Sequence, residues 1–124
     1  GLNPRAPIAA NNLAFLYAQE GRNLDEALSL AQTAVAGQPE SADMNDTLGW
    51  VLYKRGMAPL AVGSLRRATE SAPNNAEHHY HLGLAYSKVG DAASARRALQ
   101  RAIQLKLPAE QNADATRVLA SLAN

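Results

Sequence analysis

The chain has 124 residues, of which 47% are apolar, and a formal net charge of +1 from twelve basic and eleven acidic residues. This length and composition suit one compact domain, and the balanced charge gives no general reason to expect nucleic acid or a membrane surface as partner. Cysteine is absent, which excludes disulfides, thiolate metal sites and cysteine nucleophiles, and no apolar run approaches the roughly twenty residues that span a bilayer.

The elements predicted from the sequence are helices throughout, because apolar residues recur about every 3.6 positions without an alternating strand pattern. The helical pattern itself repeats after thirty-four residues. Equivalent residues at this spacing are Pro39 and Pro73, Leu48-Gly49 and Leu82-Gly83, Ala27, Ala61 and Ala95, and Ala34, Ala68 and Ala102. A fixed period of this length predicts a stack of two-helix units that bury their faces against one another.

In chain order, residues 1–6 are interpreted as the remnant of a preceding repeat or a linker, because Pro4 lies thirty-five residues before Pro39. Three units are predicted at 7–41, 42–75 and 76–109, each with two antiparallel helices, and a capping helix at 110–124. Together they form a single domain, which we interpret as a part of a longer array. Prolines separate the units because a proline inside a helix removes a backbone hydrogen bond and clashes with the preceding turn.

The turns within the units carry signals for helix ends. The first helix of each unit is predicted to end at a glycine, which adopts left-handed backbone easily: Gly21, Gly56 and Gly90. Asp91 is predicted to cap the helix that follows, and Asn23 with Glu26 forms a similar capping pair in the first unit. That unit has one extra residue before Ala27, which predicts a longer turn.

The capping helix is predicted to be amphipathic. Its apolar residues are Ala113, Val118, Leu119 and Leu122, and the polar residues between them are Gln111, Asp114, Arg117 and Ser121. We expect the apolar side to cover the core of the third unit and the polar residues to face outwards, as the end of a repeat array requires.

These motifs resemble the tetratricopeptide repeat over residues 7–109. The third unit carries the fullest set, with Tyr80, Leu82-Gly83, Ala85-Tyr86, Gly90-Asp91, Ala95, Leu99 and Ala102. The resemblance implies an all-α, right-handed solenoid of three helix-turn-helix units plus the capping helix. Gly49 and Gly83 are expected to let the two helices of a unit approach closely. Asn45 and His79 stand where the family often has a bulky aromatic, so we expect looser packing there and a buried, neutral imidazole at His79.

The resemblance also implies a function, that of a non-catalytic scaffold whose first helices line a concave groove for a peptide or helix of another protein. Phe15, Trp50 and Leu84 are expected to form an apolar row along this groove. The predicted groove residues are Asn11, Asn12, Phe15, Asp46, Thr47, Trp50, Tyr53, Lys54, Tyr80, His81, Leu84 and Lys88. The alternative is that Phe15 and Trp50 only pack against adjacent helices, which would make the chain a structural spacer or a self-association module.

Other binding chemistries have less support in the sequence. Some tetratricopeptide domains clamp the C-terminal carboxylate of a chaperone, but the matching positions here contain no cation: they are Asn11, Phe15, Thr47, Glu77 and His81. His78 and His81 are three residues apart, yet no cysteine or paired carboxylate stands nearby to complete a metal site. We therefore expect no metal at this position.

A third functional hypothesis is a strip for an anionic polymer on the convex face. It rests on the basic residues of the second helices, which are Arg66, Arg67, Arg96, Arg97 and Arg101. No nucleophile elbow, phosphate-cradling glycine loop or metal motif is present in the sequence. We therefore expect neither enzyme activity nor a cofactor.

A narrower resemblance rests on the segments Asn11-Asn12-Leu13-Ala14, Asp46-Thr47-Leu48-Gly49-Trp50 and His79-Tyr80-His81-Leu82. In series they are similar to the C-terminal repeats of bacterial tetratricopeptide lipoproteins of exopolysaccharide and PEP-CTERM-type export systems. That resemblance implies a periplasmic scaffold in envelope assembly. The expected partner is a protein, without nucleic acid and without membrane contact by this segment.

Overall fold

The computed structural model describes residues 6–122 and contains, within that range, seven α-helices and no strand. The helices are α1 (Ala6–Glu20), α2 (Leu24–Gly37), α3 (Ala42–Lys54), α4 (Ala58–Ser71), α5 (Ala76–Lys88), α6 (Ala92–Gln104) and α7 (Ala109–Leu122). None of the seven has the length and apolar character needed to cross a membrane. The predicted all-α solenoid fold is confirmed. The predicted remnant at 1–6 lies outside the described residues except for Ala6, which begins α1.

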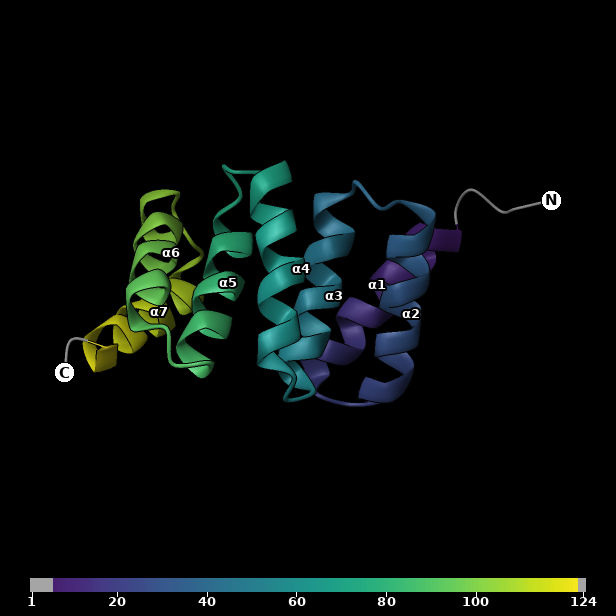
Figure 1. Cartoon of the computed structure of the whole chain (residues 1–124), viewed down its shortest axis with the longest axis horizontal. Coiled ribbons are helices and arrows are strands. Elements are labelled where there is room, and N and C mark those ends of the chain that lie inside the picture. Colours follow the sequence, from purple (N-terminus) through teal and green to yellow (C-terminus); the bar gives the residue numbers. More distant parts are fainter. Residues whose placement is uncertain (1–5, 123–124) are drawn as a thin grey trace.

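The helices form two walls that follow the row of units (Figure 1). The pairs α1–α2, α3–α4 and α5–α6 pack together. In addition, α1 contacts α3, α3 contacts α5, and α5 contacts α7. Within the described part of the chain, α2, α4 and α6 do not contact one another. The row therefore curves with α1, α3, α5 and α7 on its inner, concave side, where the groove residues were predicted.

The turns within the units agree with the sequence except at Asn23. Gly21, Gly56 and Gly90 adopt the left-handed conformation, with φ of 67°, 84° and 86°, and Asp91 caps α6 by accepting a bond from the Ser94 N–H (3.1 Å). Asn23, by contrast, makes no side-chain capping bond. Its own backbone is left-handed (φ 52°), because the extra residue of this turn needs a second left-handed position, and asparagine tolerates one. The predicted Asn23–Glu26 capping pair is wrong.

Close approach of the two helices within a unit depends on Gly49 and Gly83, as predicted. A Cβ atom at Gly49 would lie 2.4 Å from Cγ of Leu65, and one at Gly83 would lie 2.5 Å from Cδ2 of Leu99. Both leucines are completely buried. Burial of a leucine side chain contributes roughly 1.5–3 kcal/mol, so each glycine gives space to a major contributor to the core.

Asn45 and His79 tie the turns between units to the helices that follow. The Asn45 amide donates to the Pro39 carbonyl (3.0 Å), and Nε2 of His79 donates to the Pro73 carbonyl (2.8 Å), six residues earlier in each case. Looser packing was expected at these positions, but each side chain makes a hydrogen bond to the preceding turn. His79 is also only half-buried, so the predicted buried imidazole is wrong. The buried histidines are His78 and His81, which are 4% and 2% exposed.

Helix α7 covers the end of the core and is rotated from the predicted orientation. Val118, Leu119 and Leu122 pack against the core as expected, but the completely buried small residue is Ala115, and Ala113 is exposed. Asp114 and Gln111, expected on the outer face, instead turn towards α5, where they contact Tyr80 and Glu77.

Candidate partner-binding groove

Polar side-chain contacts join the successive helices α1, α3, α5 and α7 of the concave wall, and the three closest of them lie at one junction each. Nε1 of Trp50 in α3 donates to Oε1 of Gln19 in α1 (2.8 Å). Nδ1 of His81 in α5 lies 2.9 Å and 3.0 Å from the carboxylate oxygens of Asp46 in α3. The Tyr80 hydroxyl of α5 donates to Oδ2 of Asp114 in α7 (2.5 Å). We call these three contacts the polar ladder; they fix neighbouring units side by side.

The last contact of the polar ladder changes the acidity of the tyrosines around it. Burial, followed by the hydrogen bond to Asp114 and the negative charge of that carboxylate, raises the pKa of Tyr80 well above its usual value. Burial and the Asp114 charge also raise the pKa of Tyr53. Both phenols therefore keep their protons at neutral pH and beyond, and Tyr80 stays a donor.

Trp50 occupies the centre of the concave wall but contributes little open surface. It is 6% exposed and lies between Tyr53 and His81, with ring centroids 5.2 Å and 4.1 Å away and nearly parallel planes. Nζ of Lys54 lies 4.8 Å from the indole centroid, which is a cation–π distance. The indole thus belongs mainly to the packing of the wall.

Two pockets open on the concave side. The first, of about 570 Å³, lies between α1, α3 and α5 and is lined by Asn11, Asn12, Phe15, Leu16, Gln19, Asp43, Asp46, Thr47, Asn75, Glu77, His78 and His81. We call it the α1–α3–α5 pocket. The second, of about 740 Å³, lies between α3, α5 and α7 and includes Trp50, Tyr53, Lys54, Tyr80, Leu84 and the α7 residues Glu110, Asp114 and Arg117. We call it the α3–α5–α7 pocket.

Comparison with known proteins identifies the family. The tetratricopeptide repeat family model matches residues 12–76 and 47–105, which together cover most of the chain. The chain belongs to the tetratricopeptide repeat family. A curated relative, the BBSome complex member BBS4 homolog of Drosophila melanogaster, is 33% identical over 95 residues, covering 76% of this chain and 20% of the relative. The chain therefore spans about a fifth of that relative's length.

Solved tetratricopeptide structures share the fold at low sequence identity. The first tetratricopeptide domain of Spaghetti (RPAP3), bound to an HSP90 peptide, superimposes with a TM-score of 0.83 at 13% identity, covering 99% of this chain and 98% of that one. PcrH in complex with the chaperone binding region of PopD gives a TM-score of 0.83 at 21% identity, covering 99% and 95%. At such identities the likeness shows the common fold.

The predicted groove residues of this tetratricopeptide chain divide between the two pockets. Phe15 lines the first pocket, and Trp50 and Leu84 line the second, so the expected continuous apolar row is interrupted. Asn11, Asn12, Asp46 and Thr47 also line the first pocket, Tyr53, Lys54 and Tyr80 the second, and His81 both. Lys88 is exposed and lines neither. Asp46, Thr47, Trp50, Tyr80, His81 and Leu84 are buried, whereas Asn12, Phe15 and Lys54 are exposed.

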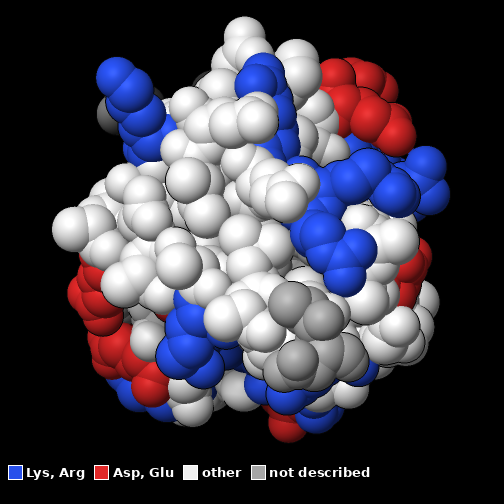
Figure 2. Space-filling view, turned by 90° about the vertical axis from the view of Figure 1, so that its left-hand side faces the viewer, with Lys and Arg blue, Asp and Glu red and all other residues white. Residues whose placement is uncertain are grey.

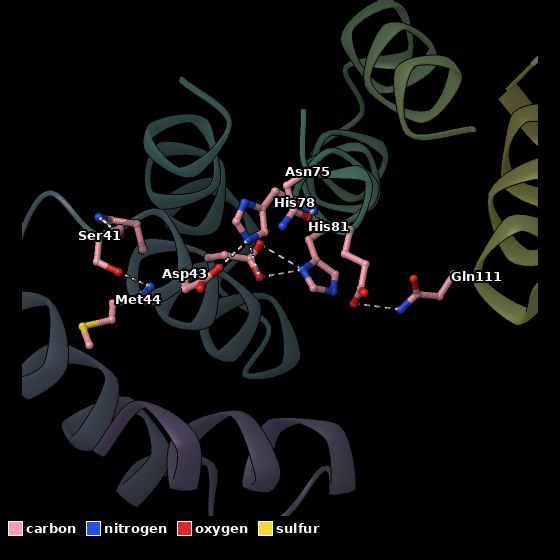
Figure 3. Close-up of polar contacts among 10 residues, drawn as sticks. Ser41, Asp43, Met44, Asn75, His78, His81 and Gln111 are labelled. Atoms are coloured by element: carbon pink, nitrogen blue, oxygen red, sulfur yellow. Dashed lines mark hydrogen bonds and ion pairs between the residues drawn. The ribbon is translucent and has the colours of Figure 1, made fainter. Parts of the chain in front are cut away.

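The α1–α3–α5 pocket contains a histidine–aspartate cluster that sequence reasoning missed (Figure 3). Nε2 of His78 lies 3.2 Å from Oδ1 of Asp43 and 3.9 Å from Oδ2 of Asp46, while His81 holds Asp46 from the other side. Asp43 and Asp46 are three residues apart, as are His78 and His81, so each pair lies on one face of its helix. This spacing was the signal for the cluster in the sequence. Two carboxylates of α3, Asp43 and Asp46, therefore stand beside the histidines. Within residues 6–122, however, no group of three or more such side chains is arranged to hold a metal ion.

The pocket brings together the five positions that match the chaperone clamp. Asn11, Phe15, Thr47, Glu77 and His81 all line it, and no lysine or arginine of the described chain does. These five positions therefore share one pocket, and its described lining lacks the cations that a carboxylate ligand would need.

The arginines of the convex face make partly internal contacts. Arg96 donates to the Leu122 carbonyl (3.3 Å) and Arg101 to Oδ1 of Asn74 (3.3 Å). Arg66, Arg67 and Arg97 are exposed. Seen from the C-terminal end of the stack, the largest group of Lys and Arg side chains lies at the right, and others are spread around the rim (Figure 2). One of these arginines, Arg96, is therefore engaged at the C-terminal end of α7.

Proposed function

We propose that this chain is a non-catalytic interaction module that binds a peptide or helix of a partner protein in its concave groove. The observation that carries the proposal is the α1–α3–α5 pocket. Phe15 and Leu16 line it and remain 37% and 47% exposed, although both belong to a helix that buries Ala10, Ala14 and Ala18 in the core. Exposed large apolar side chains beside a concave polar pocket are typical of an anchor site for another polypeptide.

The related structures support this proposal. Spaghetti carries an HSP90 peptide, and PcrH carries the chaperone binding region of PopD. The burial of Trp50 and Tyr80 shifts the expected anchor from the centre of the groove to its N-terminal part, at Phe15.

The test is a selection of random displayed peptides on the immobilised chain, followed by affinity measurements with variants. Phe15→Ala should weaken the selected peptides about tenfold or more, since truncating an interface anchor costs about 1.4 kcal/mol or more. Leu60→Ala is the matched control, because Leu60 is 60% exposed on α4, away from the groove. Equal effects of the two substitutions, or no selected peptide, would contradict the proposal.

The two alternatives predict different measurements. A self-association module would show a molar mass that rises with protein concentration in sedimentation equilibrium and falls back in Phe15→Ala. A convex strip for an anionic polymer would bind heparin with steep salt dependence, and neutralising Arg66 and Arg97 would abolish that binding. Neither outcome is expected if the concave groove is the functional surface.

The cellular setting is a finer part of the proposal. The sequence segments similar to bacterial export lipoproteins support a scaffold in envelope or exopolysaccharide assembly. Fractionation of the native organism, with an antibody against this chain, tests the setting. Recovery in the periplasmic or outer-membrane fraction is expected, and recovery in the cytosol would refute this part alone.

A further inference from the structure

We propose that the α1–α3–α5 pocket receives a lysine or arginine side chain of the partner, an assignment that rests on the proposed function. Three carboxylates line the pocket, those of Asp43, Asp46 and Glu77, and no lysine or arginine of the described chain lines it. Counted without the histidines, the lining therefore carries a formal charge of −3. A cationic side chain complements that charge, whereas a carboxylate ligand would be repelled.

The positions of these carboxylates leave them free to bind. The Asp43 side chain is 80% exposed and uses one oxygen towards His78. Asp46 is buried, with both oxygens facing Nδ1 of His81 and with Nε2 of His78 3.9 Å from Oδ2, but a carboxylate has about four lone-pair positions. Glu77 is exposed, and its one contact in the described structure is a long hydrogen bond from Gln111 at 3.5 Å. Each carboxylate thus keeps acceptor capacity for a donor from outside.

Buried atoms without partners provide a second, independent indication. His78 is 4% exposed and lines the pocket, yet its Nδ1 has no hydrogen-bond partner among the described residues. Nε2 of His78 donates towards Oδ1 of Asp43, so a neutral ring leaves Nδ1 as an acceptor. Oδ1 of Asn11, in the same pocket, is a buried acceptor without a partner among the described residues. Buried polar atoms are rarely left unpaired, and the Asn11 oxygen in particular requires a donor.

The apolar part of the pocket suits the rest of a basic side chain. Phe15 and Leu16 offer exposed apolar surface beside the acceptors. Lysine and arginine bury an aliphatic stem along such a surface while their charged group reaches polar atoms, and a guanidinium also stacks on an aromatic ring. Neither an acidic nor a purely apolar side chain would use both parts of this site.

The experiment uses the peptides selected on the wild-type chain as probes. We expect them to be enriched in lysine or arginine, and replacement of that residue by citrulline or norleucine should weaken binding about tenfold or more, as loss of a charged hydrogen-bonding group does. Asp43→Asn and Glu77→Gln should each weaken binding roughly two- to fivefold, because each removes one partly solvated charge. Glu70→Gln is the matched control, since Glu70 lies exposed on α4.

The outcomes separate this inference from the proposed function. Peptides that require Phe15 but contain no basic residue, or that bind Asp43→Asn and Glu77→Gln as tightly as wild type, would overturn the basic-side-chain assignment and leave the groove in place. Absence of any binding peptide would overturn both. If a pocket variant fails to fold by circular dichroism, the citrulline and norleucine peptides still test the assignment on the wild-type chain.

Discussion

Replacing Gly49 with alanine is expected to destabilise the fold, although alanine favours helices more than glycine does. A Cβ atom at this position would lie 2.4 Å from Cγ and 2.6 Å from Cδ2 of Leu65, far inside the roughly 3.5–4.0 Å at which carbon atoms are in contact. Leu65 is completely buried and cannot turn towards solvent. The Ala61 carbonyl oxygen, 3.3 Å from the same Cβ, limits how α4 can shift.

The expected loss follows from two opposing contributions. Overpacking a close-packed core costs about 1–3 kcal/mol, and the depth of this overlap places Gly49→Ala near the upper value. The higher helix propensity of alanine returns about 1 kcal/mol. The net loss is therefore about 2 kcal/mol, which lowers the Tm of a domain of this size by roughly 8 °C.

Urea unfolding followed by circular dichroism measures this loss, with Gly63→Ala as the matched control. Gly63 is also helical but exposed, and a Cβ atom there would meet nothing within 4 Å. The same substitution should therefore stabilise the protein by about 0.5–1 kcal/mol. If Gly49→Ala is as stable as Gly63→Ala, the close approach of α3 and α4 does not depend on the missing side chain, and the reasoning fails.

Three further predictions concern the wall and its turns. Tyr80→Phe removes the bond to Asp114 and should lower the free energy of unfolding by about 1 kcal/mol at pH 7. Because the folded-state pKa of Tyr80 is raised, the contribution of this bond to wild-type stability is full below about pH 10 and falls above it. The urea midpoints of the two proteins should therefore converge towards pH 11, and a constant difference would contradict this. Trp50 emission should be blue-shifted and poorly quenched by acrylamide at every protein concentration, since Trp50 is 6% exposed; readily quenched emission would show an open groove. Gln19→Ala should shift the emission spectrum, because it leaves the indole N–H without its hydrogen-bond acceptor. Asn23→Gly should leave the thermal midpoint unchanged or raise it, whereas Asn23→Ser should lower the free energy of unfolding by about 1 kcal/mol, because serine disfavours left-handed backbone. If the serine variant were the more stable of the two, the capping interpretation would be restored.

The fold was predictable because its determinants are local and periodic. Gly49 and Gly83 mark the close approaches, and the glycines at the turns mark the helix ends, so their roles can be recognised without knowing any contact. The conformation of Asn23 was not predicted, because an asparagine three residues before a glutamate is equally suited to a helix cap and to a left-handed turn. The extra residue of that turn was the distinguishing signal, and its conformational consequence was missed.

The sequence pointed to the first helices as the place of the candidate site, which stays a prediction, but it did not reveal the contacts that build the site. Which of His78, His79 and His81 is buried depends on the rotation of α5, and one residue corresponds to about 100° on a helix. The contacts of the polar ladder span 31, 35 and 34 residues, so a strict period does not pair Gln19 with Trp50 or Asp46 with His81. Such pairs depend on side-chain reach across two helices, which no single-sequence pattern specifies.

The three contacts of the polar ladder also encode the order in which units can stack. An indole meets an amide at the first junction, an imidazole meets a carboxylate at the second, and a phenol meets a carboxylate at the third. If a unit were skipped, Gln19 would face Leu84, which is equivalent to Trp50, and Asp46 would face Ala115, which is equivalent to His81. The second wrong neighbour would leave the buried Asp46 carboxylate without its partner, which costs about 1–3 kcal/mol or more for a charge. The apolar faces of the units are similar to one another, so the polar ladder favours the correct order of units. It does so both during folding and when two copies of the chain meet.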